Sequence, residues 1–153
     1  MPDLLVFVDE SNGVYGLIAV KEGYLRAVVK RLSWVKHYRE VRKNKERYLK
    51  AFPHRFLKVK QILVYSRIYF RIGDLMRFLN AIKNEIEILV LDDKLYGKII
   101  DKIDWAGLIL ESRNPAKYRR LMLLADNLAN YARIQIFRHG KRKSIKKLKE
   151  LEK

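Results

Sequence analysis

The sequence predicts an α/β fold, in which a mixed sheet of about five strands has helices on both faces. Two short segments, Leu4–Val8 and Ile86–Leu91, are apolar at almost every position, which is typical of central strands covered on both faces. Other stretches place apolar residues at helical spacing, and they alternate along the chain with the strand-like segments. This alternation indicates helices packed against a sheet. The 153 residues suffice for one such domain.

The N-terminal part is predicted to form a hairpin followed by a long helix. Strands at Leu4–Val8 and Val14–Val20 flank Asn12-Gly13, a pair that readily adopts the positive φ angles of a tight turn. Pro53 is expected to end the helical region, because proline lacks the N–H that a helix interior needs. The helix itself is predicted from Tyr24 to about Lys50 by one apolar stripe, formed by Leu25, Val28, Val29, Leu32 and Val35.

The middle of the chain is predicted to alternate between strands and short helices. Leu57–Ile72 is rich in β-branched and aromatic residues and predicts one long strand or two short ones. Gly73-Asp74 can cap a short helix. Ile86–Leu91 predicts the next strand, and it is followed by a helix over about Leu95–Ile103 and a strand over Gly107–Glu111.

The C-terminal part is predicted to be a long helix and a basic tail. Asn114-Pro115 predicts the start of the helix, because proline suits the first helical position. Gly140 is expected to close it. We therefore expect one domain over residues 1–140 and a basic tail over residues 141–153 that can be removed with little loss of fold. The tail is predicted to be helical from about Ser144, with an apolar side formed by Ile145, Leu148 and Leu151.

Positive charge is concentrated in two segments. The chain has 34 Lys and Arg against 17 Asp and Glu, a net charge of +17. Residues 36–60 carry +8 and residues 138–153 carry +6. This distribution favours a nucleic-acid partner, DNA or RNA; the alternative is the solvated surface of a heat-stable protein. The candidate nucleic-acid-binding residues are Arg39, Arg42, Lys43, Lys45, Arg47, Lys141, Arg142, Lys143, Lys146 and Lys147.

Several functional classes are excluded by what the sequence lacks. There is no Cys, which excludes disulfide scaffolds, thiolate zinc sites, cysteine nucleophiles and Fe–S clusters. The glycine-rich phosphate loops of P-loop and Rossmann proteins are also absent. No apolar run approaches the roughly 20 residues of a membrane-spanning helix, and the first residues lack the positive charge of a secretory signal. We expect a cytoplasmic protein without membrane contact; the oligomeric state stays open, a dimer included.

Carboxylates follow both predicted central strands, as Asp9-Glu10 and Asp92-Asp93. The carboxyl ends of parallel strands meet at the edge where α/β sheets bind ligands, and clustered carboxylates favour Mg²⁺ or Mn²⁺. Asp126 lies among apolar residues in LMLLADNLANYA and needs a partner there. We expect Asp9, Asp92 and Asp126 to hold the metal, and Glu10 or Asp93 to orient the attacking water. Taken singly, these residues also fit structural roles: Asp9 in a turn, Asp92-Asp93 as a helix cap, and Asp126 in a hydrogen bond or ion pair.

Other candidate residues have weaker support from the sequence. Glu111 at the end of a predicted strand offers a further carboxylate, and Ser11 has no base near it in the sequence. Aromatic and arginine residues interleave in one predicted strand, as in single-strand binding surfaces, but this pattern is also typical of a strand with one buried face. The interleaved residues are Tyr65, Arg67, Tyr69, Phe70 and Arg71. Solvated or structural roles are expected for His37, His54 and His139.

Three short motifs resemble those of an RNase H-like family that opens with a DESG strand and closes with a LADxxA helix. They are Val8-Asp9-Glu10-Ser11, Val90-Leu91-Asp92-Asp93, and the segment LADNLA at residues 124–129. The resemblance implies an RNase H-like fold and a metal site made of Asp9, Asp92 or Asp93, and Asp126. Asn12 stands where the family has Gly, and the predicted helix after the hairpin replaces a third strand.

The leading hypothesis is a Mg²⁺- or Mn²⁺-dependent nuclease, or a related phosphodiester-acting protein, with the basic segments holding the nucleic acid. The fold by itself does not imply a reaction. One alternative is a nucleic-acid-binding protein without catalysis. The other is a structural subunit of a nucleoprotein complex that docks through its tail helix.

Overall fold

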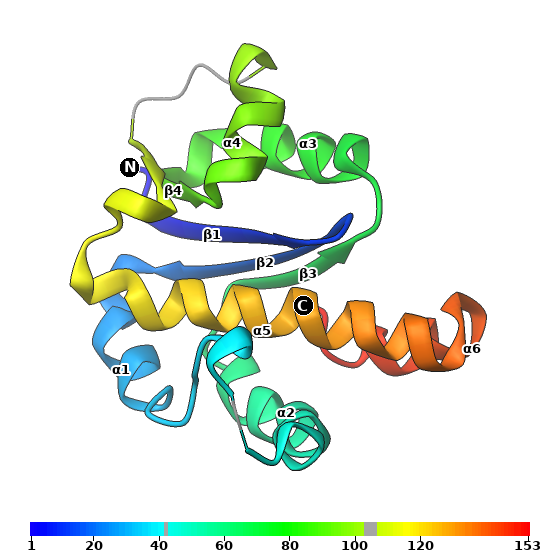
Figure 1. The fold of residues 1–153 in the computed structure, drawn as a ribbon. Coiled ribbons are helices and arrows are strands. Elements are labelled where there is room, and N and C mark those ends of the chain that lie inside the picture. The colour runs from blue at the N-terminus through cyan, green and yellow to red at the C-terminus, as the bar shows by residue number, and fades with distance from the viewer. Residues whose placement is uncertain (42, 103–106) are drawn as a thin grey trace.

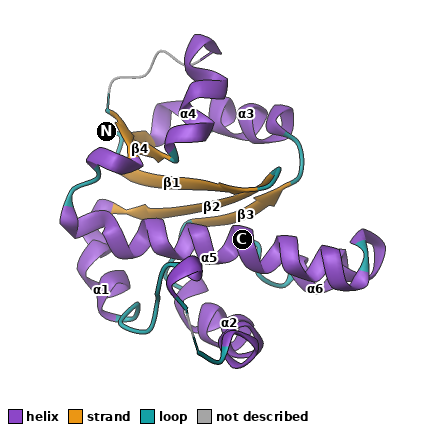
Figure 2. Ribbon diagram, viewed as in Figure 1, coloured by secondary structure: helices purple, strands orange, loops and turns teal. Residues whose placement is uncertain are grey.

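The computed structural model describes residues 1–41, 43–102 and 107–153. In this part of the chain one mixed sheet has five strands in the order β3-β2-β1-β4-β5 (Figure 2). β2 pairs antiparallel with β1 and β3, whereas β1, β4 and β5 are parallel. The predicted α/β fold class is confirmed, and the topology is consistent with an RNase H-like fold. The strands are β1 (Leu4–Ser11), β2 (Val14–Lys21), β3 (Tyr65–Tyr69), β4 (Ile86–Leu91) and β5 (Leu108–Leu110).

Helices cover both faces of the sheet, which explains why β1 is apolar at every position from Leu4 to Val8. Leu5 and Phe7 of β1 pack in one core, and Leu4, Val6 and Val8 pack in the other. α3 (Ile72–Ala81) and α4 (Asp93–Ile99) cover one face (Figure 1). The other face carries α1 (Leu25–Lys30), α2 (Lys45–Lys60), α5 (Arg119–His139) and α6 (Lys141–Lys149). Short 3-10 turns occupy Glu22–Tyr24, Tyr38–Glu40, Lys83–Glu85, Ile100–Lys102, Glu111–Arg113 and Ala116–Tyr118.

The single helix predicted over Tyr24–Lys50 is wrong. α1 and α2 are separated by a loop that includes residues 31–41. This loop lies against α5, where the backbone N–H of Tyr38 donates to Asp126 Oδ2 at 3.0 Å. Asn127 Nδ2 donates to a carbonyl of the same loop at 2.7 Å. Contacts made only in the folded protein therefore interrupt a helical pattern that is continuous in the sequence.

Pro53 does not end the helical region; it lies inside α2. Four apolar side chains of α2 are buried around it, and each contributes about 1.5–3 kcal/mol. Together they outweigh the roughly 3 kcal/mol cost of a proline in a helix interior. The helical spacing continues to Lys60, so the extended segment predicted over Leu57–Ile72 is reduced to the five residues of β3. The buried side chains are Leu49, Phe52, Phe56 and Val59.

The later elements match the predictions more closely. β4 covers the predicted residues, and β5 lies within the predicted strand. α4 begins two residues earlier than predicted, and its predicted end, Ile103, lies outside the described residues. A 3-10 turn separates Pro115 from α5. Gly140 closes α5 as expected, with a φ of +81°. Among the described residues, no helix combines the length and apolar character needed to cross a membrane.

The predicted basic tail is an integral part of the fold. α6 follows Gly140 directly, and Ser144 lies inside it rather than at its start. Leu148 and Leu151 are each 2% exposed and belong to the same core as the buried side chains of α2 and α5. Lys153 and Ser66 exchange backbone hydrogen bonds of 2.8 and 3.1 Å beside β3. This differs from the expectation that the tail can be removed with little loss of fold.

Candidate metal centre

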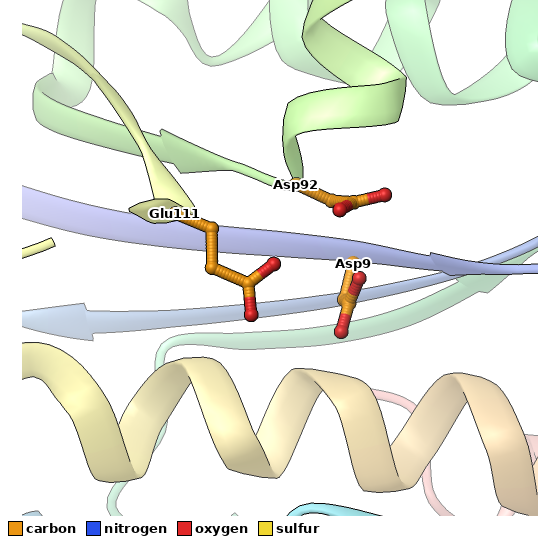
Figure 3. Close-up of side chains that lie close together, drawn as sticks. All are labelled: Asp9, Asp92 and Glu111. Carbon is orange, nitrogen blue, oxygen red and sulfur yellow. The ribbon is translucent and has the colours of Figure 1, made fainter. Parts of the chain in front are cut away.

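Three carboxylates lie at the carboxyl ends of three neighbouring parallel strands. Asp9 is near the end of β1, Asp92 directly follows β4, and Glu111 directly follows β5. The residues immediately before them are register partners across the sheet. Figure 3 shows the three side chains directed toward one space above α5. One oxygen from each carboxylate lies within 4.8 Å of the others, so this acidic triad can hold a metal ion.

The acidic triad is crowded, with Asp9 buried and Asp92 and Glu111 half-buried. Burial, together with the charges of Glu111, Asp126 and Asp92, raises the pKa of Asp9 to about 9. Burial and the neighbouring charges of Asp92 and Asp126 together raise the pKa of Glu111 to about 7. The pKa of Asp92 is raised chiefly by burial as well. Such carboxylates require either protons or a cation to balance their charge.

Asp126 lies at the same cavity but is not part of the acidic triad, in contrast to its predicted role as a metal ligand. Its Oδ2 accepts from the N–H of Tyr38 at 3.0 Å, and its Oδ1 accepts from Asn130 Nδ2 at 3.0 Å. His37 Nε2 is 4.0 Å from Oδ1. Asp126 thus anchors the loop that includes Tyr38 beside the acidic triad. Glu111, which had weaker support in the sequence, is the third member of the triad.

A glycine allows α5 to approach the sheet closely enough for this arrangement. Gly16 of β2 is the register partner of Asp9. A Cβ added at Gly16 would lie 2.6 Å from the carbonyl oxygen of Ala125 and 2.9 Å from the nitrogen of Ala129. Only a residue without a side chain fits between β2 and the α5 backbone. Asp126, next to Ala125, is thereby carried to the edge of the sheet beside Asp9.

The two residues predicted to orient water differ in their surroundings. Glu10 lines the cavity, but Lys98 Nζ donates to both of its carboxylate oxygens at 2.8 and 2.9 Å. Asp93 is exposed at the start of α4, where its Oδ1 accepts from the N–H of Ser112 at 3.2 Å. Asp93 is not among the residues that line the cavity. Both carboxylates therefore have structural partners.

The cavity also holds positively charged side chains, of which only Arg39 was among the predicted nucleic-acid-binding residues. Its volume is about 280 Å³, and Arg39, Lys94 and Arg133 line it together with the acidic groups. Arg133 Nε donates to Ser11 Oγ at 2.6 Å, and its Nη2 donates to Asn130 Oδ1 at 3.1 Å. Asp126, Asn130 and Arg133 are four and three residues apart, the spacing of one helix face. That spacing is visible in the sequence and could have predicted that these three side chains lie together on one face of the helix.

The two basic segments, distant in sequence, meet on one surface. Lys43 and Arg47 line a hollow beside the Tyr38 loop. Arg47 also lines a second hollow with Lys147 of α6. Lys45 Nζ lies 5.3 Å from the ring centroid of Tyr38, and Lys141 Nζ lies 4.9 Å from that of Phe70. Three further predicted residues, Arg142, Lys143 and Lys146, are exposed on α6. Arg42 lies outside the described part of the chain.

Comparisons of this chain with protein-family models, with curated proteins and with solved structures find no match.

Proposed function

We propose that this protein is a divalent-metal-dependent nuclease that cleaves phosphodiester bonds in nucleic acid. The observation that carries the proposal is the acidic triad: Asp9, Asp92 and Glu111 lie at the carboxyl ends of three adjacent parallel strands, with oxygens within 4.8 Å of one another. A rigid sheet edge holds them without the need for a flexible loop. Preorganised carboxylates of this kind suit the binding of an ion at a reacting phosphate.

Mg²⁺ or Mn²⁺ fits the donor set best. All three groups offer hard carboxylate oxygens, and the described part of the site contains no thiolate, which disfavours softer metals. The raised pKa values of Asp9 and Glu111 reflect repulsion and burial that a cation would offset. When bound, such an ion supplies a Lewis acid for phosphate oxygens and lowers the pKa of a coordinated water.

The cations around the triad favour an anionic substrate. Arg39, Lys94 and Arg133 line the same cavity, and no described carboxylate forms an ion pair with any of the three. The basic hollows that share Arg47 continue away from the cavity. A polyanion could therefore contact positive charge on both the cavity wall and α2, which favours a polymer over a small phosphate ester.

Calorimetric titration with Mn²⁺, combined with a cleavage assay on single- and double-stranded DNA and RNA, tests the proposal. Wild type should bind Mn²⁺ and cleave at least one of these substrates. Asp9→Asn and Glu111→Gln should lose both Mn²⁺ binding and cleavage, because each removes an anionic ligand from the triad. Asp126→Asn should still bind Mn²⁺. Nucleic-acid affinity of Asp9→Asn should be unchanged or slightly higher, since a negative charge near the phosphate is removed.

Asp74→Asn is the matched control, because Asp74 is a carboxylate on α3, across the sheet from α5. It should match wild type in Mn²⁺ binding and cleavage. A wild-type protein that binds nucleic acid but cleaves none of the substrates in Mn²⁺ would overturn the nuclease assignment. The alternative of a non-catalytic nucleic-acid-binding protein would then replace it.

A further inference from the structure

The face of α5 that borders the metal centre continues beyond it as a polar and then an aromatic surface. Asp126, Asn130, Arg133 and Phe137 are spaced by four, three and four residues, so their side chains project from one side of the helix. The first three line the cavity. Phe137 lies one turn further on and is 89% exposed, in contrast to most large apolar side chains of this protein.

Arg133 is held in place without being neutralised. Its guanidinium donates to Ser11 Oγ and to Asn130 Oδ1, which are both uncharged acceptors. Asn130 is fixed in turn, since its Nδ2 donates to Asp126 Oδ1 at 3.0 Å and Ser11 Oγ donates to its Oδ1 at 2.9 Å. No described carboxylate forms an ion pair with Arg133. A half-buried, oriented guanidinium that no carboxylate neutralises is suited to bind a phosphate oxygen.

Phe137 provides a different kind of contact next to this charge. Residues four apart on a helix have Cβ atoms roughly 6 Å from each other, so Phe137 projects next to Arg133 from the same side of α5. An exposed aromatic ring beside a cation is the arrangement on which unpaired bases stack. Bases within a duplex are stacked on one another and cannot reach such a ring.

We propose that this face of α5 binds a single-stranded segment of nucleic acid, with a phosphate on Arg133 and the neighbouring base stacked on Phe137. The inference rests on the proposed nuclease function, whose substrate class it specifies. Arg133 lies two turns beyond Asp126 along α5 and contacts Ser11, two residues after Asp9. The strand would therefore lead from the metal centre outward along the helix.

Binding in EDTA, where no metal-dependent cleavage occurs, tests this surface directly. The probes are fluorescein-labelled twelve-nucleotide oligothymidylate and oligouridylate and a DNA duplex of the same length, measured by anisotropy over a range of salt. At least one single strand should bind more tightly than the duplex. Phe137→Ala should weaken that binding about 5- to 150-fold without changing its salt dependence, because no charge is lost.

Arg133→Met should also weaken binding and should lower the log–log salt slope by about 0.7, the contribution of one phosphate on a single strand. Arg133→Lys keeps the positive charge and should keep the wild-type salt slope. A lower slope in Arg133→Met alone then indicates a lost phosphate contact rather than a loss of fold. Two control substitutions lie away from this surface. Arg77→Met is on α3, and Tyr24→Ala lies beyond Lys21, at the end of β2 that is farther from Asp9. Neither should change affinity or slope.

Tighter binding of the duplex, with Phe137→Ala equal to wild type, would overturn the inference and leave metal-dependent cleavage unaffected. Arg133→Met with an unchanged slope would overturn the assignment of the phosphate contact. Conversely, single-strand binding that depends on both residues, in a protein that never cleaves, would refute the nuclease proposal alone. A 2-aminopurine base in the strand provides an independent readout, since stacking on Phe137 should quench its fluorescence in wild type but not in Phe137→Ala.

Discussion

Gly16→Ala is the substitution that most directly tests how α5 is seated on the sheet. The new Cβ would lie 2.6 Å from the carbonyl oxygen of Ala125 and 2.9 Å from the nitrogen of Ala129, where ordinary contacts begin at 3.4 Å. Both neighbours are backbone atoms of a 21-residue helix, so a side-chain rotation cannot relieve the clash. α5 would have to retreat by about 0.8 Å, the shortfall between the Ala125 contact and an ordinary one.

Overpacking of this kind lowers the free energy of unfolding by about 1–3 kcal/mol. The same displacement would disturb the geometry of the 3.0 Å hydrogen bond from the Tyr38 N–H to Asp126, so the loss should fall toward the upper end of that range. Urea denaturation followed by far-UV circular dichroism measures it, with the m-value as a check that the unfolding transition is unchanged.

Gly97→Ala is the matched control, because a Cβ at Gly97 in α4 meets nothing within 4 Å. It should raise stability by about 0.5–1 kcal/mol through higher helix propensity. A Gly16→Ala protein as stable as wild type would refute the conclusion that α5 and β2 are in backbone contact at this point.

The metal-free protein should lose stability as the pH rises from about 4 to about 9, because burial holds the folded-state pKa of Asp9 at about 9 and that of Glu111 at about 7. The folded state then binds more protons than the unfolded state, and this stabilisation disappears as they dissociate. Mn²⁺ should reverse the trend, since it binds the deprotonated triad; melting curves at several pH values with and without Mn²⁺ would show this, and metal-free stability that rises over the range would contradict it. Deleting residues 141–153 should cost about 3–6 kcal/mol or abolish folding, because Leu148 and Leu151 leave the core; an unchanged melting temperature would contradict the structural role of the tail.

The strands of the central sheet and two members of the acidic triad could be predicted from local sequence. β1 and β4 are short apolar runs, and such runs have few alternatives to a strand covered on both faces. Asp9 directly follows the apolar run of β1 and Asp92 directly follows β4, and the parallel pairing of the two strands brings the carboxylates together. The two basic segments were also visible, because charge is a property of composition and needs no fold to be recognised.

Other features depend on contacts between residues far apart in the sequence. Glu111 completes the triad only because β5 pairs beside β4, and the three residues of β5 carry too weak a pattern to specify that position. Asp126 was recognised as a carboxylate in need of a partner, but its partner is the backbone of a loop 88 residues away.

The same reason accounts for the errors in helix boundaries and in the tail. Helical periodicity runs without a break past residue 30, and only the packing of the following loop on α5 interrupts it. Pro53 is tolerated within α2 because the side chains around it are buried against other elements. Local sequence therefore determined which segments are strands, where acidic groups follow them, and where charge is concentrated. Tertiary structure decided which of those groups meet, because burial and hydrogen bonding across the chain outweigh local preferences of about 1 kcal/mol or less per residue.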